Sequence, residues 1–396
     1  MTGTAAKMLQ LMTSSFFESI VRFFGICMLV KALSLESFGE YSIIVSVAAI
    51  TATVVNFGGY NLIMSSKKEV KEIYFSEILL TLLNTFFLIS LLLLLSLLYD
   101  LSLLVFSIFL AEHFIVSIQA ITYASLLKER NELVLSLVRT TISLFFLLVC
   151  ALLSYVDSSE SFFIILYVLY SFFSCLIYIY SVIYSSNKKI IFTLPCISEY
   201  QFRLKDGVWF LASGLARSAF FNIDKVIVGF FFSKETTAIY AIAMRMHNAL
   251  FSIVNSALAT TESAFYNLRN SELKNHYKKS FKYSFCISFM ISLFGVFTIP
   301  FLIKLLPNDY SIIVNFLYVI SITLIFQSIL WNNLNYFNGI RKERVRLLCM
   351  MLGIIVLFLL NGGNFLFSLG IFPLYIYMIS ILFILLYSFS KVDNES

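Results

Sequence analysis

The chain has 396 residues, of which 60% are hydrophobic and 13% are charged, and its mean hydropathy is +0.91. Soluble domains contain about 45–50% apolar and about 25% charged residues, so the composition excludes an ordinary soluble protein and indicates a polytopic integral membrane protein. The net charge of +6 does not indicate a nucleic-acid partner, because the basic residues lie in short runs between apolar segments.

Apolar runs bounded by charges or turn residues predict an all-α fold with about twelve transmembrane helices. In the first half they cover residues 11–33, 40–64, 77–99, 101–123, 132–155 and 160–184. In the second half they cover residues 207–232, 236–262, 281–304, 309–331, 346–369 and 371–390. Spans of about 20 residues leave only short loops here and no room for a separate extramembrane catalytic domain. The first run is not a cleavable signal peptide, because Glu18 and Arg22 interrupt its apolar core.

The distribution of basic residues predicts the orientation. Most of the 28 Lys and Arg residues fall in the loops on one side of the membrane, whereas the other side holds only Lys31, Lys234 and Lys304. Basic loops mark the cytoplasmic side, so we expect both termini to be cytoplasmic.

The longest connection divides the predicted helices into six plus six. We expect an N-terminal bundle at 1–184, a cytoplasmic linker at 185–206 and a C-terminal bundle at 207–396. Because six is even, both halves enter the membrane from the same side, as in a parallel repeat. The turn at 34–41 matches the turn at 233–240 in its Ser, Glu and Tyr positions. The pattern indicates an internally duplicated transporter rather than a membrane-anchored enzyme.

Charged side chains inside the predicted spans point to a polar cavity between the two bundles. Each basic residue facing lipid would cost about 2.5–3.5 kcal/mol, so we expect these residues to face a polar interior or a partner. The basic residues are Arg22, Arg139, Arg217, Lys225 and Arg245, and the acidic ones considered with them are Glu18, Glu112, Asp224 and Glu262. One face of span 236–262 adds a polar stripe that includes Asn248, Ser252 and Asn255.

Structural roles for these groups remain open alternatives. The pairs Glu18 with Arg22 and Arg217 with Asp224 have helical spacing and could simply fix helix register, while Glu262 could reach the cytoplasmic interface. We interpret the isolated histidines as satisfied packing residues. No CxxC, HExxH or clustered His/Cys pattern is present in the sequence, so we expect no metal site.

Several short motifs resemble the Wzx-type polysaccharide flippases of the multidrug/oligosaccharidyl-lipid/polysaccharide (MOP) exporter superfamily. They are the LESFGEY turn at 35–41, Asn56-Phe-Gly58, and NIDKVIVG at 222–229 followed by Ala238-Ile-Tyr240. The sequence departs from the family at Asn56, where Asp is common, and at 260–264, where a proline-containing pattern is replaced by TTESA.

This resemblance implies a MATE-like (MOP) architecture of two six-helix bundles. It also implies the translocation of undecaprenyl-pyrophosphate-linked oligosaccharide repeat units across the bacterial cytoplasmic (inner) membrane by alternating access. The product would be O-antigen, capsule or a related surface polysaccharide, and the protein would not be an enzyme. The implied partners are the lipid-linked oligosaccharide, membrane lipid and other polysaccharide-assembly membrane proteins. No cofactor is implied, and a proton or sodium gradient would drive transport.

The resemblance also assigns roles to the charged and polar residues. Arginine binds pyrophosphate oxygens with its planar fork, and polar side chains suit sugars. The candidates for the pyrophosphate headgroup are Arg22, Arg139, Arg217, Lys225 and Arg245. The candidates for charge partners or a coupling-ion site are Glu18, Asp224, Glu112 and Glu262. The candidates for sugar contacts are Asn248, Ser252 and Asn255.

Four other functions are alternatives to this one. A drug/cation antiporter of the same superfamily needs an anionic pocket, whereas the span-embedded cations here equal or outnumber the acids. A polysaccharide polymerase or acyltransferase would carry a large external loop or a compact His/Asp constellation. In a membrane scaffold the buried charges would be purely structural. The lipid II flippase branch is usually longer by two helices.

Overall fold

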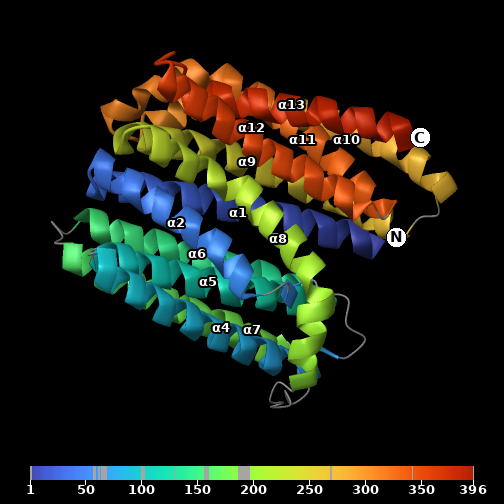
Figure 1. Ribbon diagram of the computed structural model, residues 1–396, viewed down its shortest axis with the longest axis horizontal. Helices are drawn as coiled ribbons and strands as arrows, with labels where there is room; N and C mark the ends of the chain where they lie inside the picture. Colours follow the sequence, from blue (N-terminus) through green and yellow to red (C-terminus); the bar gives the residue numbers. More distant parts are fainter. Residues whose placement is uncertain are drawn as a thin grey trace. The chain divides into compact units, whose positions relative to one another are not determined.

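The computed structural model describes residues 2–56, 59–60, 63, 69–99, 103–129, 131–155, 160–185, 197–267, 270–340 and 342–395. Within these residues the fold is all-helical, as the apolar runs predict (Figure 1). The elements in chain order are α1 (Thr2–Ala32), α2 (Leu35–Val55), α4 (Val70–Tyr99), α5 (Leu103–Lys128), α6 (Glu132–Tyr155), α7 (Glu160–Ser185), α8 (Ile197–Phe231), α9 (Lys234–Asn267), α10 (Asn270–Ile303), the 3-10 helix η1 (Asn308–Phe316), α11 (Leu317–Gly339), α12 (Glu343–Leu366) and α13 (Pro373–Glu395).

Ten segments in the described part of the chain are long and apolar enough to cross a membrane. They cover α1, α2, α4 to α7, α10, η1 with α11, α12 and α13. The helices outside this set, α8 and α9, occupy the expected spans 207–232 and 236–262 and contain most of the charged side chains predicted within spans. The protein is therefore a multi-pass membrane protein in which α8 and α9 carry more than half of the charged candidate residues.

Several helix boundaries differ from the expected ones; α10, for example, begins at Asn270 rather than at 281. Helix α8 begins at Ile197, so the last part of the expected linker 185–206 is helical. The expected span 309–331 begins with η1, which follows Pro307, and becomes α-helical only at Leu317.

The chain forms two compact units. The first contains residues 1–42 and 223–396, and the second contains residues 43–222. In the first unit α1 packs on α9, α9 packs on α10 and α11, and α13 packs on α11 and α12. In the second unit α5 packs on α4, α6 and α7. The expected bundles at 1–184 and 207–396 divide the chain at other positions, and that division stays a prediction.

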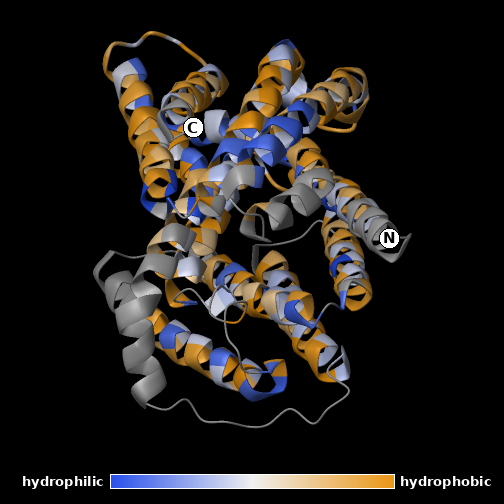
Figure 2. Ribbon diagram, turned by 90° about the vertical axis from the view of Figure 1, so that its right-hand side faces the viewer, coloured by the Kyte–Doolittle hydropathy of each residue, from blue (hydrophilic) through white to orange (hydrophobic). Residues whose placement is uncertain are grey.

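Both units expose apolar side chains on their outer helix faces, and hydrophobic residues dominate most helices in Figure 2. Phe297 and Phe301 on α10 are each 70% exposed, and Phe87 on α4 is 75% exposed. Side chains of this kind are stable at a surface that meets hydrocarbon rather than water. The exposed faces therefore agree with helices that lie in a bilayer.

Two turns of similar sequence begin helices in the first unit. The Ser34 hydroxyl accepts a hydrogen bond from the backbone N–H of Ser37 at 3.1 Å, and the Ser233 hydroxyl accepts one from the N–H of Thr236 at 3.2 Å. Each serine thus satisfies a free donor in the first turn of its helix, α2 or α9. The sequence match between residues 34–41 and 233–240 therefore has a structural counterpart in these helix caps.

Candidate functional site

The two matched turns contact one another within the first unit. We call this arrangement of residues 34–41 against 233–240 the hairpin contact. The ammonium group of Lys234 lies 3.0 Å from a carboxylate oxygen of Glu36 and 2.5 Å from one of Glu40. Hydrogen bonds to Glu40 and Glu36 hold the pKa of Lys234 above its usual range, so this lysine stays charged at neutral pH. Sequence reasoning missed this cluster because its partners are far apart in the chain.

Arg245 lies on α9 beside the hairpin contact. The guanidinium carbon is 5.9 Å from the ring centroid of Phe38 and 5.9 Å from that of Tyr41. The Nε atom of Arg245 is buried and has no hydrogen-bond acceptor among the described residues. Cation–π contacts stabilise the charge without using the N–H donors. This arginine is therefore a positioned cation with hydrogen-bonding capacity left for an anionic ligand.

The polar stripe expected beside Arg245 lies on the same helix. Asn248, Ser252 and Asn255 are all half-buried. The side-chain carbonyl oxygen of Asn255 is buried with no donor among the described residues. A buried amide oxygen of this kind is suited to accept a hydrogen bond from a ligand hydroxyl. The side chain of Glu262, a candidate charge partner or coupling-ion residue, lies outside the part that the structure describes.

On α1, Glu18 and Arg22 form the ion pair that their spacing predicts. The Nε atom of Arg22 is 3.1 Å from a carboxylate oxygen of Glu18, and the arginine side chain is 40% exposed. Glu18 itself is buried. The acid thus fixes the arginine while part of the guanidinium stays accessible.

Asp224 on α8 has different partners from the one expected. One carboxylate oxygen accepts a hydrogen bond from Lys225 at 3.0 Å, and the other accepts one from the Tyr240 hydroxyl at 3.0 Å. Asp224 and Tyr240 are fully buried and Lys225 is nearly so. The expected pair of Asp224 with Arg217 gives way to these contacts, because Tyr240 approaches from α9 and both carboxylate oxygens are engaged. Arg217 is exposed on α8.

A second buried polar group in the first unit joins residues of α9, α11 and α13. The Nε2 atom of His247 is 2.5 Å from the side-chain oxygen of Gln327, and the hydroxyl of Tyr377 donates to the same oxygen at 3.5 Å. His247 also stacks on Phe251. The Nε2 atom of His247 thus has a partner, but its Nδ1 atom is buried with no hydrogen-bond partner among the described residues, so the expected satisfied packing residue is found only in part. Gln327 and Tyr377 were missed, since neither is charged.

The second unit holds its own charged residues. Arg139 donates to the hydroxyl of Tyr123 at 3.0 Å and lies over the same ring. Glu112 accepts a hydrogen bond from the hydroxyl of Tyr167. His113 is fully buried and is held through its ring nitrogens by Thr51 and Thr85. Arg139 and Glu112 thus each have a tyrosine partner, and His113 is a packed residue as expected.

The described residues contain no cluster of three or more His, Cys, Asp or Glu side chains suited to hold a metal ion. Several charged groups of the two units are instead paired with one another or with tyrosine and phenylalanine side chains.

The sequence matches two family models. The model described as "Polysaccharide biosynthesis protein" matches residues 4–263, and the model MatE matches residues 211–362. Comparison with curated proteins gives no match.

The fold is similar to that of solved membrane transporters. Lipid II flippase MurJ in an inward closed conformation superposes with a TM-score of 0.65 at 17% identity, over 97% of this chain and 87% of that one. A MOP superfamily transporter from Pyrococcus furiosus gives a TM-score of 0.65 at 14% identity, over 98% and 95%. An inward-facing multidrug resistance MATE family transporter gives 0.61 at 11% identity, over 98% and 95%. At these identities the similarity establishes the MOP-type fold.

Proposed function

Because the chain belongs to the polysaccharide biosynthesis protein family, we propose that it is a Wzx-type flippase for undecaprenyl-pyrophosphate-linked oligosaccharide repeat units. The family match, which covers more than half of the chain, supports a role in making a polysaccharide. The MOP-type fold supports movement of a solute across the membrane rather than a chemical reaction. The expected resemblance to this superfamily is confirmed, and the identity of the cargo is the proposal.

The observation that supports this proposal most directly is the environment of Arg245. Its charge is held over two aromatic rings while its buried Nε has no acceptor within the described residues. A pyrophosphate supplies the anionic oxygens that a guanidinium binds best. Arg22 and Lys225 of the same unit, and Arg139 and Arg217 of the other, are the further candidates for this headgroup, and the stripe at Asn248, Ser252 and Asn255 is the candidate sugar contact.

Alternating access gives the hairpin contact a role in the cycle. The predicted topology puts residues 34–41 and 233–240 on the periplasmic side, with both termini in the cytoplasm of a bacterial cell. The hairpin contact would then close that side while the headgroup enters from the cytoplasmic leaflet, and it would open to release the headgroup. A proton or sodium ion that competes with Lys225 for Asp224 would couple this movement to a gradient.

A drug/cation antiporter is the second candidate, and the MatE match over residues 211–362 favours it. Such a protein needs a carboxylate available to a cationic ligand. In the first unit Glu18 is paired with Arg22, and Asp224 is paired with Lys225. These acids are thus already neutralised by cations of the chain, which favours an anionic cargo.

The two candidates are separated by reconstituting the protein in vesicles. One arm measures the transfer of an undecaprenyl-pyrophosphate-linked oligosaccharide between leaflets, detected by its access to an external lectin or glycosidase. The other arm measures gradient-driven exchange of a cationic dye. Transfer of the lipid-linked sugar without dye exchange supports the flippase, and dye exchange without sugar transfer would replace it with the antiporter.

A further inference from the structure

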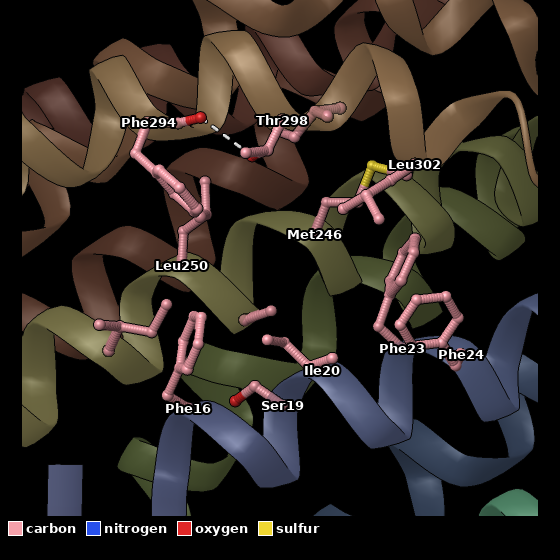
Figure 3. A pocket seen from close by; sticks show the side chains of 13 residues that line it. Phe16, Ser19, Ile20, Phe23, Phe24, Met246, Leu250, Phe294, Thr298 and Leu302 are labelled. Carbon is pink, nitrogen blue, oxygen red and sulfur yellow. Dashed lines mark hydrogen bonds between the residues drawn. The ribbon is translucent and has the colours of Figure 1, made fainter. Parts of the chain in front are cut away.

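An apolar cavity of about 290 Å³ lies within the first unit between α1, α9 and α10 (Figure 3). Phe16, Ile20 and Phe24 line it from α1, Leu250 lines it from α9, and Phe294 and Thr298 line it from α10. The hydroxyl of Thr298 donates to the backbone carbonyl of Phe294 at 2.9 Å and is thereby satisfied within its own helix. The cavity therefore offers a ligand hydrocarbon contacts and little hydrogen bonding.

Helices α9 and α10, which both line the cavity, pack closely against each other. A Cβ atom at Gly295 would lie 2.7 Å from a methyl carbon at the end of the Leu250 side chain, so the two helices are closely packed at this point. Helix α1 also packs on α9. The cavity is therefore a groove between α1 and α10, and α9 packs against both of these helices.

The α1 wall of the groove is partly exposed. Phe16, Ile20 and Phe24 recur every four residues along α1 and are 38%, 37% and 38% exposed. They lie in the span Thr13–Ala32, and the α10 residues lie in the span Glu272–Ile303. When an apolar groove within a membrane span is empty, the side chains that line it lose dispersion contacts. A hydrocarbon chain is therefore the ligand that suits this groove best.

The charged pair of α1 lies on the other side of the same helix. Glu18 and Arg22 alternate with the three groove residues at a spacing of two, which places them roughly 160° around the helix from the groove. Helix α1 thus has an apolar face toward the groove and a charged face on which the Arg22 side chain is 40% exposed. A lipid whose headgroup is an anion and whose tail is a long hydrocarbon matches both faces of this one helix.

We infer that this groove binds the polyprenyl chain of the lipid-linked substrate while Arg22, on the opposite face of α1, contributes to the binding of its headgroup. The inference rests on the proposed flippase function. A polyprenyl chain carries methyl branches along its length, and these can fill gaps between the side chains of the groove wall and gain dispersion contacts. The groove therefore holds the tail beside the headgroup during transfer.

The test uses undecaprenyl pyrophosphate carrying a diazirine in its chain, photolysed with the full-length protein in phosphatidylglycerol vesicles. We expect labelled peptides from residues 13–32 and 272–303, and we expect unlabelled undecaprenyl pyrophosphate to compete. A phosphatidylglycerol diazirine probe serves as the second arm. Equal labelling of the groove by that probe, with no competition by the polyprenyl lipid, would show an ordinary acyl chain and overturn the inference.

Two variants fill the groove from opposite walls. Thr298→Phe and Ile20→Trp should each reduce polyprenyl labelling about tenfold, since each displaces a few methylene contacts. Val296→Phe on α10 and Phe17→Trp on α1 enlarge lipid-exposed side chains outside the groove and should label like the wild type. Only variants that match the wild-type melting temperature are compared, and the competition arm needs no variant.

Failure of this inference differs from failure of the proposed function. Polyprenyl labelling that maps elsewhere, or that survives in both filled variants while the wild type still transfers lipid-linked sugar, would refute the groove and leave the flippase standing. A wild-type protein that neither transfers lipid-linked sugar nor is labelled by the polyprenyl probe would refute both.

Discussion

A Cβ atom at Gly39 would overlap the backbone carbonyl oxygen of Lys234, so the two matched turns approach as closely as they do only because Gly39 lacks a side chain. The corresponding position in the other turn is Ala238, which is fully buried. The two halves of the hairpin contact are thus similar in sequence but not interchangeable at their closest point.

Gly39→Ala should destabilise the protein, because the new methyl group must displace a backbone carbonyl rather than a flexible side chain. We expect a loss of about 1–3 kcal/mol, visible as a lower melting temperature in detergent. Gly363→Ala in α12 is the matched control, since a Cβ atom there meets nothing within 4 Å. Equal melting temperatures for the two variants would contradict the close approach at Gly39.

Charge reversal at the hairpin contact should change the transport cycle more than stability. Lys234→Glu places an acid beside Glu36 and Glu40, which favours separation of the two turns. We expect a cysteine introduced near the turns to become more accessible to a membrane-impermeant reagent, and the double variant Lys234→Glu with Glu40→Lys to reverse this. Unchanged accessibility in the single variant would argue against a gate.

Removing one partner of the buried ion pair on α8 should lower the stability of the folded protein. Asp224→Asn leaves Lys225 as a buried cation without its counter-ion, and breaking such a pair costs about 3–5 kcal/mol. The double variant Asp224→Leu with Lys225→Met should recover stability but lose gradient-driven transport if Asp224 couples an ion. A stable double variant that transports normally would make the pair purely structural.

The contact of His247 with Gln327 should matter for folding alone. Gln327→Leu removes the acceptor of the buried imidazole, and an unsatisfied buried polar group costs about 1–3 kcal/mol. Transport per folded molecule should equal that of the wild type, measured in vesicles with matched protein insertion. A variant of normal stability with reduced transport would assign His247 a part in the cycle instead.

Features that depend on local sequence could be predicted, and features that depend on distant residues could not. Apolar runs gave the helices, and the i,i+4 spacing gave the pair of Glu18 with Arg22. The spacing of Arg217 and Asp224 was equally suggestive but wrong, because Tyr240 on the next helix occupies the carboxylate together with Lys225.

The contacts of Arg245 also depend on residues that are distant in the sequence and could not be predicted. Its place in a polar stripe was evident from helical spacing, but the rings of Phe38 and Tyr41 lie about 200 residues away in the sequence. The match between the two turns was the one signal that could have brought these segments together, since turns related by a repeat often occupy equivalent positions in a duplicated fold.

The measurement that tests the central claim most directly is the initial rate of transfer of an undecaprenyl-pyrophosphate-linked oligosaccharide in vesicles, for the wild type, Arg245→Lys and Arg245→Ala at matched insertion and melting temperature. If Arg245 binds the pyrophosphate, Arg245→Ala should lose transfer by at least about tenfold and Arg245→Lys should retain part of it, since lysine keeps the charge but not the planar fork. Wild-type transfer that is matched by Arg245→Ala, or a wild type that transfers no lipid-linked sugar, would contradict the account.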